Sequence, residues 1–213
     1  MPARVKICGL RRVSEVAACI EAGAGWIGLN FYAPSPRSVD LALGHELSRA
    51  AEGRIGRVAL TVDADDATLA AIVSEVGVDM LQLHGRETPE RVAEVRRIFG
   101  LPVMKAVGVA GPEDLGALDA HAEVADWLLV DAKPPRGAAL PGGNGLAFDH
   151  RLVAGRDWTR PWMLAGGLTP DTVAEALRLT GAPVADVSSG VEAAPGVKDG
   201  ALVAAFCAAA TSA

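Results

Sequence analysis

The chain has 213 residues, of which 50% are hydrophobic and 4% aromatic, and its formal net charge is −6. This length and apolar content are enough for one well-buried core, and no linker or low-complexity stretch divides it, so we expect a single domain over residues 1–213. The acidic balance and scarce aromatic residues argue against nucleic-acid binding, which uses basic surfaces and stacking platforms. No apolar run is long enough to span a bilayer, so we expect no nucleic acid and no membrane among its partners.

The cysteines indicate the compartment. The chain has three cysteines, Cys8, Cys19 and Cys207. Their number is odd and their spacing does not match a metal site, which is typical of free thiols in a reducing environment. The N-terminus carries Arg4 and Lys6 and lacks the apolar region of a secretory signal. We therefore expect a cytoplasmic protein without a metal site.

Strand-like and helix-like segments alternate along the whole chain. Short apolar runs predict strands at 5–8, 26–31, 58–62, 80–83, 103–107, 127–131, 162–165 and 184–188. Apolar residues at helical spacing predict helices around 13–20, 41–51, 69–76, 92–98, 115–118, 148–153, 173–177 and 202–206. Thr88-Pro89 and Thr169-Pro170 each place a capping hydroxyl before a proline and so indicate two helix starts. This alternation is typical of a (β/α)₈ barrel or of a large doubly wound sheet.

The positions of the glycine-rich loops distinguish these two folds. A doubly wound dinucleotide-binding fold has a G-x-G-x-x-G turn after its first strand, and no such turn follows Cys8. Here Gly166-Gly167 follows the seventh expected strand and Ser188-Ser189-Gly190 follows the eighth. Loops after strands seven and eight form the common phosphate site of these barrels. The sequence therefore predicts an α/β fold, a single-domain (β/α)₈ TIM barrel.

Two distant strands end in ionisable residues. Strand alternation places Lys6 and Cys8 on one face, which we expect to point into the barrel, with Asp131 at the mouth. A buried lysine needs a partner, and a nearby cation would lower the pKa of the thiol. A thiol and a carboxylate at one end of the barrel suggest a general base and a general acid. The alternatives are an inert buried Cys8 and an Asp131 that caps the following turn.

Three further residues have two interpretations each. Arg37, in the loop after the second strand, is either solvated or available to grip a carboxylate with two hydrogen bonds. Asp186, at the end of the eighth strand, offers the same choice as Asp131. His84, at the end of the fourth strand, is either a hydrogen-bonded scaffold residue or a proton carrier.

Seven segments of the chain match the sequence pattern of one known family in the same order: 5–10, 31–37, 82–85, 129–133, 164–168, 186–192 and 195–199. Together they resemble the phosphoribosylanthranilate isomerase family of tryptophan biosynthesis over nearly the whole chain. The Lys-Ile-Cys-Gly-Leu opening and the Asp-Val-Ser-Ser-Gly-Val-Glu segment are its most specific parts.

The resemblance implies an Amadori rearrangement of N-(5-phosphoribosyl)anthranilate, with neither cofactor nor metal, in a monomer or homodimer that binds a small phosphorylated substrate. It implies that Asp131 is the general acid that opens the ribose ring and that Cys8 is the thiolate that removes the C2 proton. Arg37 would hold the anthranilate carboxylate, and His84 and Asp186 would also contact the substrate. The phosphate would lie against Gly143, Gly166, Gly167, Ser188, Ser189 and Gly190.

Two positions depart from the family pattern: Asn144 stands where threonine is usual, and Asp63 where asparagine is usual. The second possible enzyme is the aminoaldose isomerase of histidine biosynthesis, whose family uses two aspartates and binds a substrate with two phosphates. Cys8 at the first of these positions and a single evident phosphate site count against it. A phosphate-binding barrel without catalysis is the third possibility, and the presence of both Cys8 and Asp131 counts against that.

Overall fold

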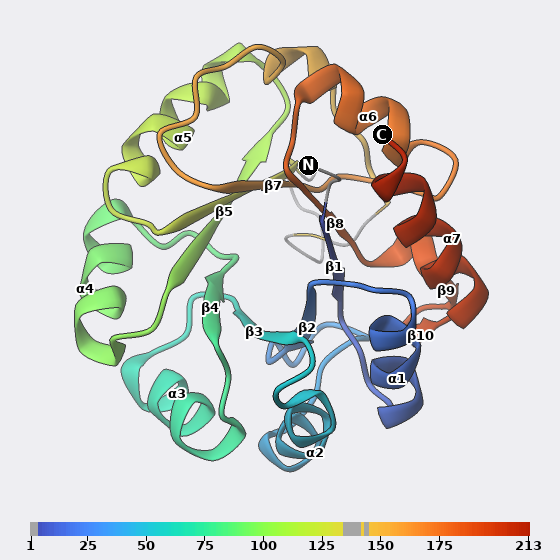
Figure 1. Ribbon diagram of the computed structural model, residues 1–213. Coiled ribbons are helices and arrows are strands. Elements are labelled where there is room, and N and C mark those ends of the chain that lie inside the picture. Colours follow the sequence, from blue (N-terminus) through green and yellow to red (C-terminus); the bar gives the residue numbers. More distant parts are fainter. Residues whose placement is uncertain (1–3, 134–141, 143–144) are drawn as a thin grey trace.

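The computed structural model describes residues 4–133, 142 and 145–213. Eight parallel strands close into a barrel in sequence order, and the helices form a ring outside them (Figure 1). The strands are β1 (Arg4–Cys8), β2 (Trp26–Asn30), β3 (Gly56–Thr61), β4 (Met80–Leu83), β5 (Val103–Val109), β6 (Trp127–Ala132), β7 (Trp162–Leu164) and β8 (Val184–Val187). Pairing of β8 with β1 completes the circle, with Lys6 opposite Asp186. The predicted barrel is confirmed.

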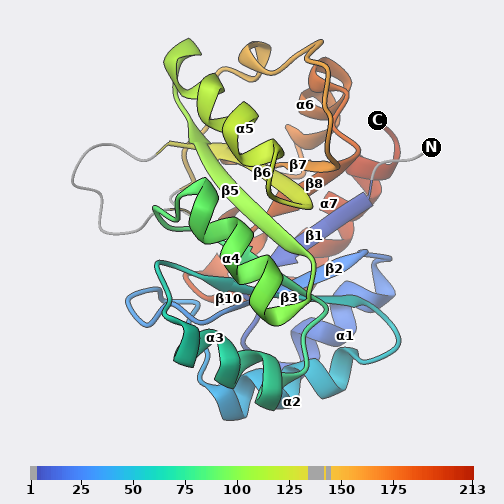
Figure 2. The same cartoon turned by 90° about the vertical axis from the view of Figure 1, so that its left-hand side faces the viewer.

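The side view shows the helices packed along the outside of the strands (Figure 2). They are α1 (Val13–Glu21), α2 (Leu41–Ala51), α3 (Asp66–Ala71), α4 (Pro89–Phe99), α5 (Leu115–Ala122), α6 (Val173–Thr180) and α7 (Gly200–Thr211). A π-helical segment, Ile72–Val76, continues α3, and between β6 and β7 the described residues form a 3₁₀ turn, His150–Leu152, where a short helix was expected. Among the described residues, no helix has the length and apolarity needed to cross a bilayer.

The two helix starts inferred from Thr-Pro pairs have different outcomes. Thr88 accepts a hydrogen bond from the Arg91 amide at 3.3 Å, with Pro89 as the first residue of α4, as predicted. The start expected at Thr169 is wrong, because α6 begins at Val173. The Thr169 carbonyl accepts from the amides of Thr172 and Val173, so the intervening residues form a turn before the helix.

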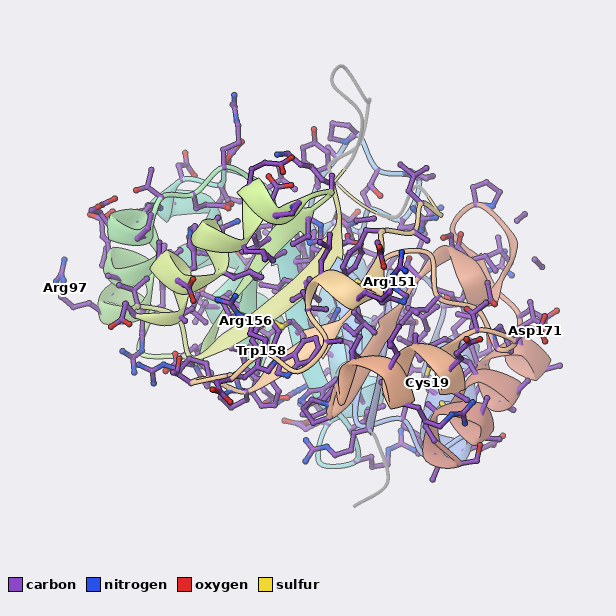
Figure 3. All side chains as sticks on the ribbon, turned by 90° about the horizontal axis from the view of Figure 1, so that it is seen from above. Cys19, Arg97, Arg151, Arg156, Trp158 and Asp171 are labelled. Atoms are coloured by element: carbon purple, nitrogen blue, oxygen red, sulfur yellow. The ribbon has the colours of Figure 1, made fainter. Side chains whose placement is uncertain are left out.

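The apolar core has two layers. Val5 and Ile7 of β1 pack in the layer between strands and helices, whereas Leu129 of β6 packs with the side chains that fill the barrel interior. At the end of the barrel where the strands begin, Trp162 stacks on Trp158 with ring centroids 4.1 Å apart. Arg156 lies beside Trp158 (Figure 3), its guanidinium 5.4 Å from the ring centre. Inside the barrel at that end, Trp26 meets Trp127 edge to face with ring centroids 5.7 Å apart. This filling leaves the carboxyl ends of the strands for chemistry.

Candidate active site

A pocket opens at the carboxyl ends of the strands, with a volume of about 800 Å³ including the part open to solvent. Its lining includes every described residue that the sequence analysis assigned to the site: Cys8, Arg37, His84, Asp131, Gly166, Gly167, Asp186, Ser188, Ser189 and Gly190. Gly143 and Asn144 lie outside the described residues. Segments from both ends of the chain therefore meet in one cavity, as expected if the strand ends carry the chemistry.

Cys8 is the last residue of β1 and is only 6% exposed. Gly28 on the neighbouring strand makes room for it, because a Cβ there would lie 2.7 Å from the Cys8 Sγ. Burial raises the pKa of the thiol; the positive charges of Lys6 and Lys198 lower it, and the negative charge of Asp186 adds to the rise. Lys6 thus lowers the pKa of Cys8, as expected of a nearby cation, but the cost of burying a thiolate outweighs both cations, and the net pKa is raised.

Lys6 has the partner that a buried lysine requires. Its Nζ donates to Asp186 Oδ1 at 2.7 Å, with side-chain exposures of 0% and 9%. Burial alone would lower the pKa of Lys6, but the charges of Asp186 and Cys8 raise it above its ordinary value. Lys6 is therefore an ammonium ion inside the barrel, below the pocket, with Asp186 at its side.

Arg37 is buried, not solvated, with 6% exposure. Its Nε and Nη2 donate to the two carboxylate oxygens of Glu192 at 2.8 and 2.9 Å. Gly9 has no side chain and so leaves room for the aliphatic part of Arg37, since a Cβ at Gly9 would lie 2.7 Å from Arg37 Cδ. Among the described residues, no hydrogen-bond acceptor meets Arg37 Nη1, so the outer edge of the guanidinium is available for a substrate anion.

Glu192 and Lys198 support residues of the pocket lining, and the sequence analysis did not single them out. They lie on a two-stranded hairpin after β8, formed by β9 (Glu192–Ala194) and β10 (Val197–Lys198). Lys198 Nζ donates to Glu192 Oε1 at 2.8 Å and to the Ser188 carbonyl at 3.0 Å. Burial opposes ionisation of Glu192, yet the hydrogen bonds and charges of Arg37 and Lys198 hold its pKa below the ordinary value. Both residues fall in the 186–199 region of the resemblance, which is the only signal that could have found them.

Because Lys198 lowers the pKa of Cys8, Lys198→Met should shift the thiol titration to still higher pH. The thiolate ultraviolet absorbance, taken as the difference between each protein and its Cys8→Ser counterpart, isolates Cys8 from Cys19 and Cys207. Lys133→Met is the matched control, since Lys133 pairs with Asp114 and is half exposed. An unchanged Cys8 titration in Lys198→Met would contradict this electrostatic role.

Asp131, near the end of β6, and His84, directly after β4, lie together in the pocket lining. Asp131 Oδ1 accepts from the Ala132 amide at 2.8 Å, and Oδ2 lies 3.4 Å from His84 Nε2. Gly142 covers the pair, because a Cβ there would lie 2.5 Å from His84 Nε2 and 2.9 Å from Asp131 Oδ2. Asp131 therefore does more than cap a turn, since one of its oxygens is directed to the histidine.

The loops after β7 and β8 form a tight, glycine-lined edge of the pocket. Gly166 and Gly167 have φ values of 91° and 66°, which side-chain-bearing residues rarely adopt. Their amides donate to no backbone carbonyl among the described residues. A Cβ at Gly190 would lie 2.0 Å from the Leu168 carbonyl oxygen, so the two loops approach as closely as backbones can. Free backbone amides in such a setting are suited to an anion.

Asp63, the second departure from the family pattern, joins the loops after β3 and β4. It is a non-glycine residue with positive φ, 49°, a conformation that Asp and Asn tolerate best. Its carboxylate accepts from the Arg86 amide at 2.6 Å, and its own amide donates to Glu87 at 2.9 Å. Glu87 in turn pairs with the buried Lys105 at 3.0 Å. Asp63 thus stabilises the loop that follows His84.

Among the described residues, no three His, Cys, Asp or Glu side chains come together in a group that could hold a metal ion.

Comparisons with known proteins agree with this geometry. The profile of the family described as N-(5'phosphoribosyl)anthranilate (PRA) isomerase matches residues 5–209. The N-(5'-phosphoribosyl)anthranilate isomerase of Cereibacter sphaeroides is 62% identical, over 95% of this chain and 96% of that protein. The enzyme of the same name from Paracoccus denitrificans is 56% identical, over 100% of this chain and 99% of that protein.

Solved structures show the same likeness. The crystal structure of phosphoribosyl anthranilate isomerase from Thermotoga maritima has a TM-score of 0.89 at 31% identity, covering 99% of this chain and 100% of that one. A complex of phosphoribosyl anthranilate isomerase with reduced 1-(o-carboxyphenylamino)-1-deoxyribulose 5-phosphate has a TM-score of 0.87 at 30% identity, with the same coverage. Likeness over the full length in both sequence and fold places this chain in the N-(5'-phosphoribosyl)anthranilate isomerase family.

Proposed function

We propose that Cys8 and Asp131 carry the proton transfers of the family's reaction in this pocket. As a member of the family, the chain is an isomerase that converts N-(5'-phosphoribosyl)anthranilate into 1-(2-carboxyphenylamino)-1-deoxyribulose 5-phosphate in tryptophan biosynthesis. The observation that supports the two roles is that a thiol and a carboxyl group, from β1 and β6, line one cavity with a buried arginine and glycine-rich loops.

The reaction begins with ring opening. Asp131 donates its proton to the furanose ring oxygen while the bond from that oxygen to C1 breaks, and its electron pair stays on the oxygen. The anthranilate nitrogen supplies its lone pair to C1, which gives a protonated Schiff base. A carboxyl group suits this step because it can donate the proton in the transition state.

Proton removal from C2 follows. The Cys8 thiolate takes that proton, the electrons form a C1–C2 double bond, and the iminium electrons return to nitrogen to give the enolamine. Tautomerisation then moves a proton from the C2 hydroxyl to C1 and leaves the ketone. The net proton count is zero, so the proton taken by Cys8 balances the one that Asp131 gave. Lys6 and Lys198 stabilise the thiolate that this step requires.

Substrate binding uses the two ends of the pocket. We propose that Arg37 holds the anthranilate carboxylate through its outer edge, and that Glu192 fixes the plane of the guanidinium by binding the inner edge. The phosphate would lie against the loops of Gly166, Gly167, Ser188, Ser189 and Gly190, as well as Gly143. His84 and Asp186 would face the ribose between them. Local cations and backbone amides thus allow a protein of net charge −6 to bind an anionic substrate.

The proposed phosphate site predicts the effect of Gly166→Val. The side chain would strain a backbone with φ of 91° and press on the Ala132 amide, 3.0 Å from the added Cβ. Loss of hydrogen bonds to a charged group should weaken product binding roughly 10–100-fold, measured by isothermal titration. Gly155→Val is the matched control, because Gly155 has a similar φ of 66° with open space around it and no place in the pocket lining. Unchanged product affinity in a folded Gly166→Val protein would contradict the site.

The reaction is tested with freshly made phosphoribosylanthranilate, whose fluorescence disappears on turnover. A second reaction supplies the aminoaldose substrate of histidine biosynthesis. Turnover of the first substrate alone is expected; turnover of the second would favour the aminoaldose isomerase, and turnover of neither would favour a binding protein.

A cytoplasmic location is also proposed, supported by three cysteines that are all buried and unpaired. We further propose that the chain acts as a single domain and as a monomer or homodimer. One solved structure is of generated monomers of the dimeric phosphoribosylanthranilate isomerase from Thermotoga maritima. Light scattering of this protein distinguishes the two states.

A further inference from the structure

Gln82, His84 and Asp131 form a line from the barrel interior to its mouth. Gln82 of β4 is completely buried, at 0% exposure, and its Nε2 lies 2.8 Å from His84 Nδ1. Leu81 and Leu83 pack in the outer core layer, so strand alternation directs Gln82 inward, where it lines the pocket. The other ring nitrogen of His84 lies 3.4 Å from Asp131 Oδ2. One histidine thus connects a buried amide to the carboxyl group that opens the ring.

The donor and acceptor roles in this line follow from chemistry. An amide nitrogen only donates, so the Gln82 NH₂ group occupies the lone pair of His84 Nδ1. With that lone pair engaged, Nδ1 carries no proton, and the single proton of a neutral imidazole is on Nε2, facing Asp131. We propose that Gln82 holds His84 as the neutral Nε2–H tautomer, and that His84 is a positioning residue for Asp131.

This state of His84 matches what the proposed function requires of Asp131, and the inference rests on that function. Asp131 must hold a proton until the ring oxygen accepts it. An imidazolium ion 3.4 Å away would favour the carboxylate and release the proton too early. A neutral Nε2–H group favours the carboxylate less than a full positive charge would, and its hydrogen bond to Asp131 strengthens as the carboxylate forms. Its contribution therefore grows along the reaction, as catalysis requires.

The surroundings isolate the pair. Asp131 Oδ1 is bound by the Ala132 amide at 2.8 Å, which leaves Oδ2 for His84. Among the described residues, Asp131 is the only carboxylate within 4.0 Å of the His84 ring nitrogens. The nearby acidic residues of the adjoining loops have other partners, since Glu87 pairs with Lys105 and Asp63 with Arg86. The other titratable side chains that line the pocket are Cys8, Tyr32, Arg37 and Asp186. Gly142 lies against the pair, and the two side chains are only 10% and 13% exposed.

The tautomer is directly measurable in the whole, unliganded protein. Long-range ¹H–¹⁵N correlation spectra report which imidazole nitrogen carries the proton, and His84→Gln identifies the His84 signals among those of four histidines. We expect wild-type His84 to be neutral and protonated at Nε2 at pH 7. In Gln82→Glu the new carboxylate accepts from Nδ1–H, so the proton should be found on Nδ1 of His84. Gln82→Met, of similar volume, is the control that removes the donor without adding a charge.

Kinetics give the second readout. Gln82→Glu should lower kcat roughly 10–100-fold with little change in KM, because a His84 with a proton on Nδ1 is either a cation or lacks the Nε2–H donor to Asp131. Gln82→Met should have a smaller effect. A wild-type His84 that is protonated at Nδ1 at pH 7 would overturn the inference, because the Gln82 amide would then be turned over and accept. Equal kcat in wild type and Gln82→Glu would also overturn it. If the wild type has no isomerase activity while His84 is the Nε2–H tautomer, the proposed function fails and the tautomer assignment stands.

Discussion

Cys8→Ala should lower kcat by roughly 10²–10⁴-fold while product affinity stays within a few-fold of wild type. The C2 proton is bound to carbon and needs a strong, well-placed base, and Cys8 is the only cysteine that lines the described pocket. The groups proposed to bind the ligand, Arg37 and the glycine loops, are untouched by the change. Turnover is followed with fresh substrate, and affinity is measured by titration with product.

Controls separate the base from the thiol's packing role. Cys8→Ser should be nearly as damaging as Cys8→Ala, because a hydroxyl group is hardly ionised at neutral pH. Cys19→Ala should leave kcat unchanged, since Cys19 is a buried thiol on α1 whose pKa burial raises to about 12. Asp131→Asn should lower kcat by a factor similar to that of Cys8→Ala, because an amide cannot protonate the ring oxygen. Near-wild-type turnover in Cys8→Ala would remove the thiol from the mechanism.

The order of elements could be predicted because the signals that determine it are local. A run of four to six apolar residues, followed by residues at helical spacing, needs no knowledge of the rest of the chain. Alternation in β1 predicted that Val5 packs outward and Lys6 inward, and both are confirmed. Burial at helix ends was less predictable: Val13 and Ile98 share the helical spacing yet are 42% and 41% exposed. The spacing of apolar residues defines one face of a helix, whereas the exposure of each residue depends on which other elements pack against that face.

The electrostatics of the site could not be predicted in the same way. The ion pair of Arg37 and Glu192 joins residues 155 positions apart, on an arginine loop and a hairpin that no local pattern links. The pKa of Cys8 depends on burial, on Lys6 and Asp186 inside the barrel, and on Lys198 from the hairpin. The sequence indicated that a cation is near the thiol, but the sign of the net effect depends on how completely the closed barrel excludes water.

Lys6→Met should lower the free energy of unfolding by about 3–5 kcal/mol, the range for breaking one side of a buried ion pair. Methionine fills a similar volume, so packing changes little. The loss arises because Asp186 keeps a carboxylate in the barrel interior without its ammonium partner at 2.7 Å. Urea unfolding followed by both circular dichroism and tryptophan fluorescence gives the value, and coincident transitions support a two-state analysis.

The double variant Lys6→Met/Asp186→Leu tests the cause of that loss. Replacing both charges by apolar groups should recover much of the stability, because an apolar pair needs no compensation for burial. Lys133→Met is the matched control: it breaks a lysine–aspartate pair with Asp114 in which the lysine is half exposed, so it should cost no more than about 1 kcal/mol. If Lys6→Met costs as little as Lys133→Met, the interior of the barrel accommodates an unpaired carboxylate. Lys6 would then have to be explained by its effect on Cys8 alone.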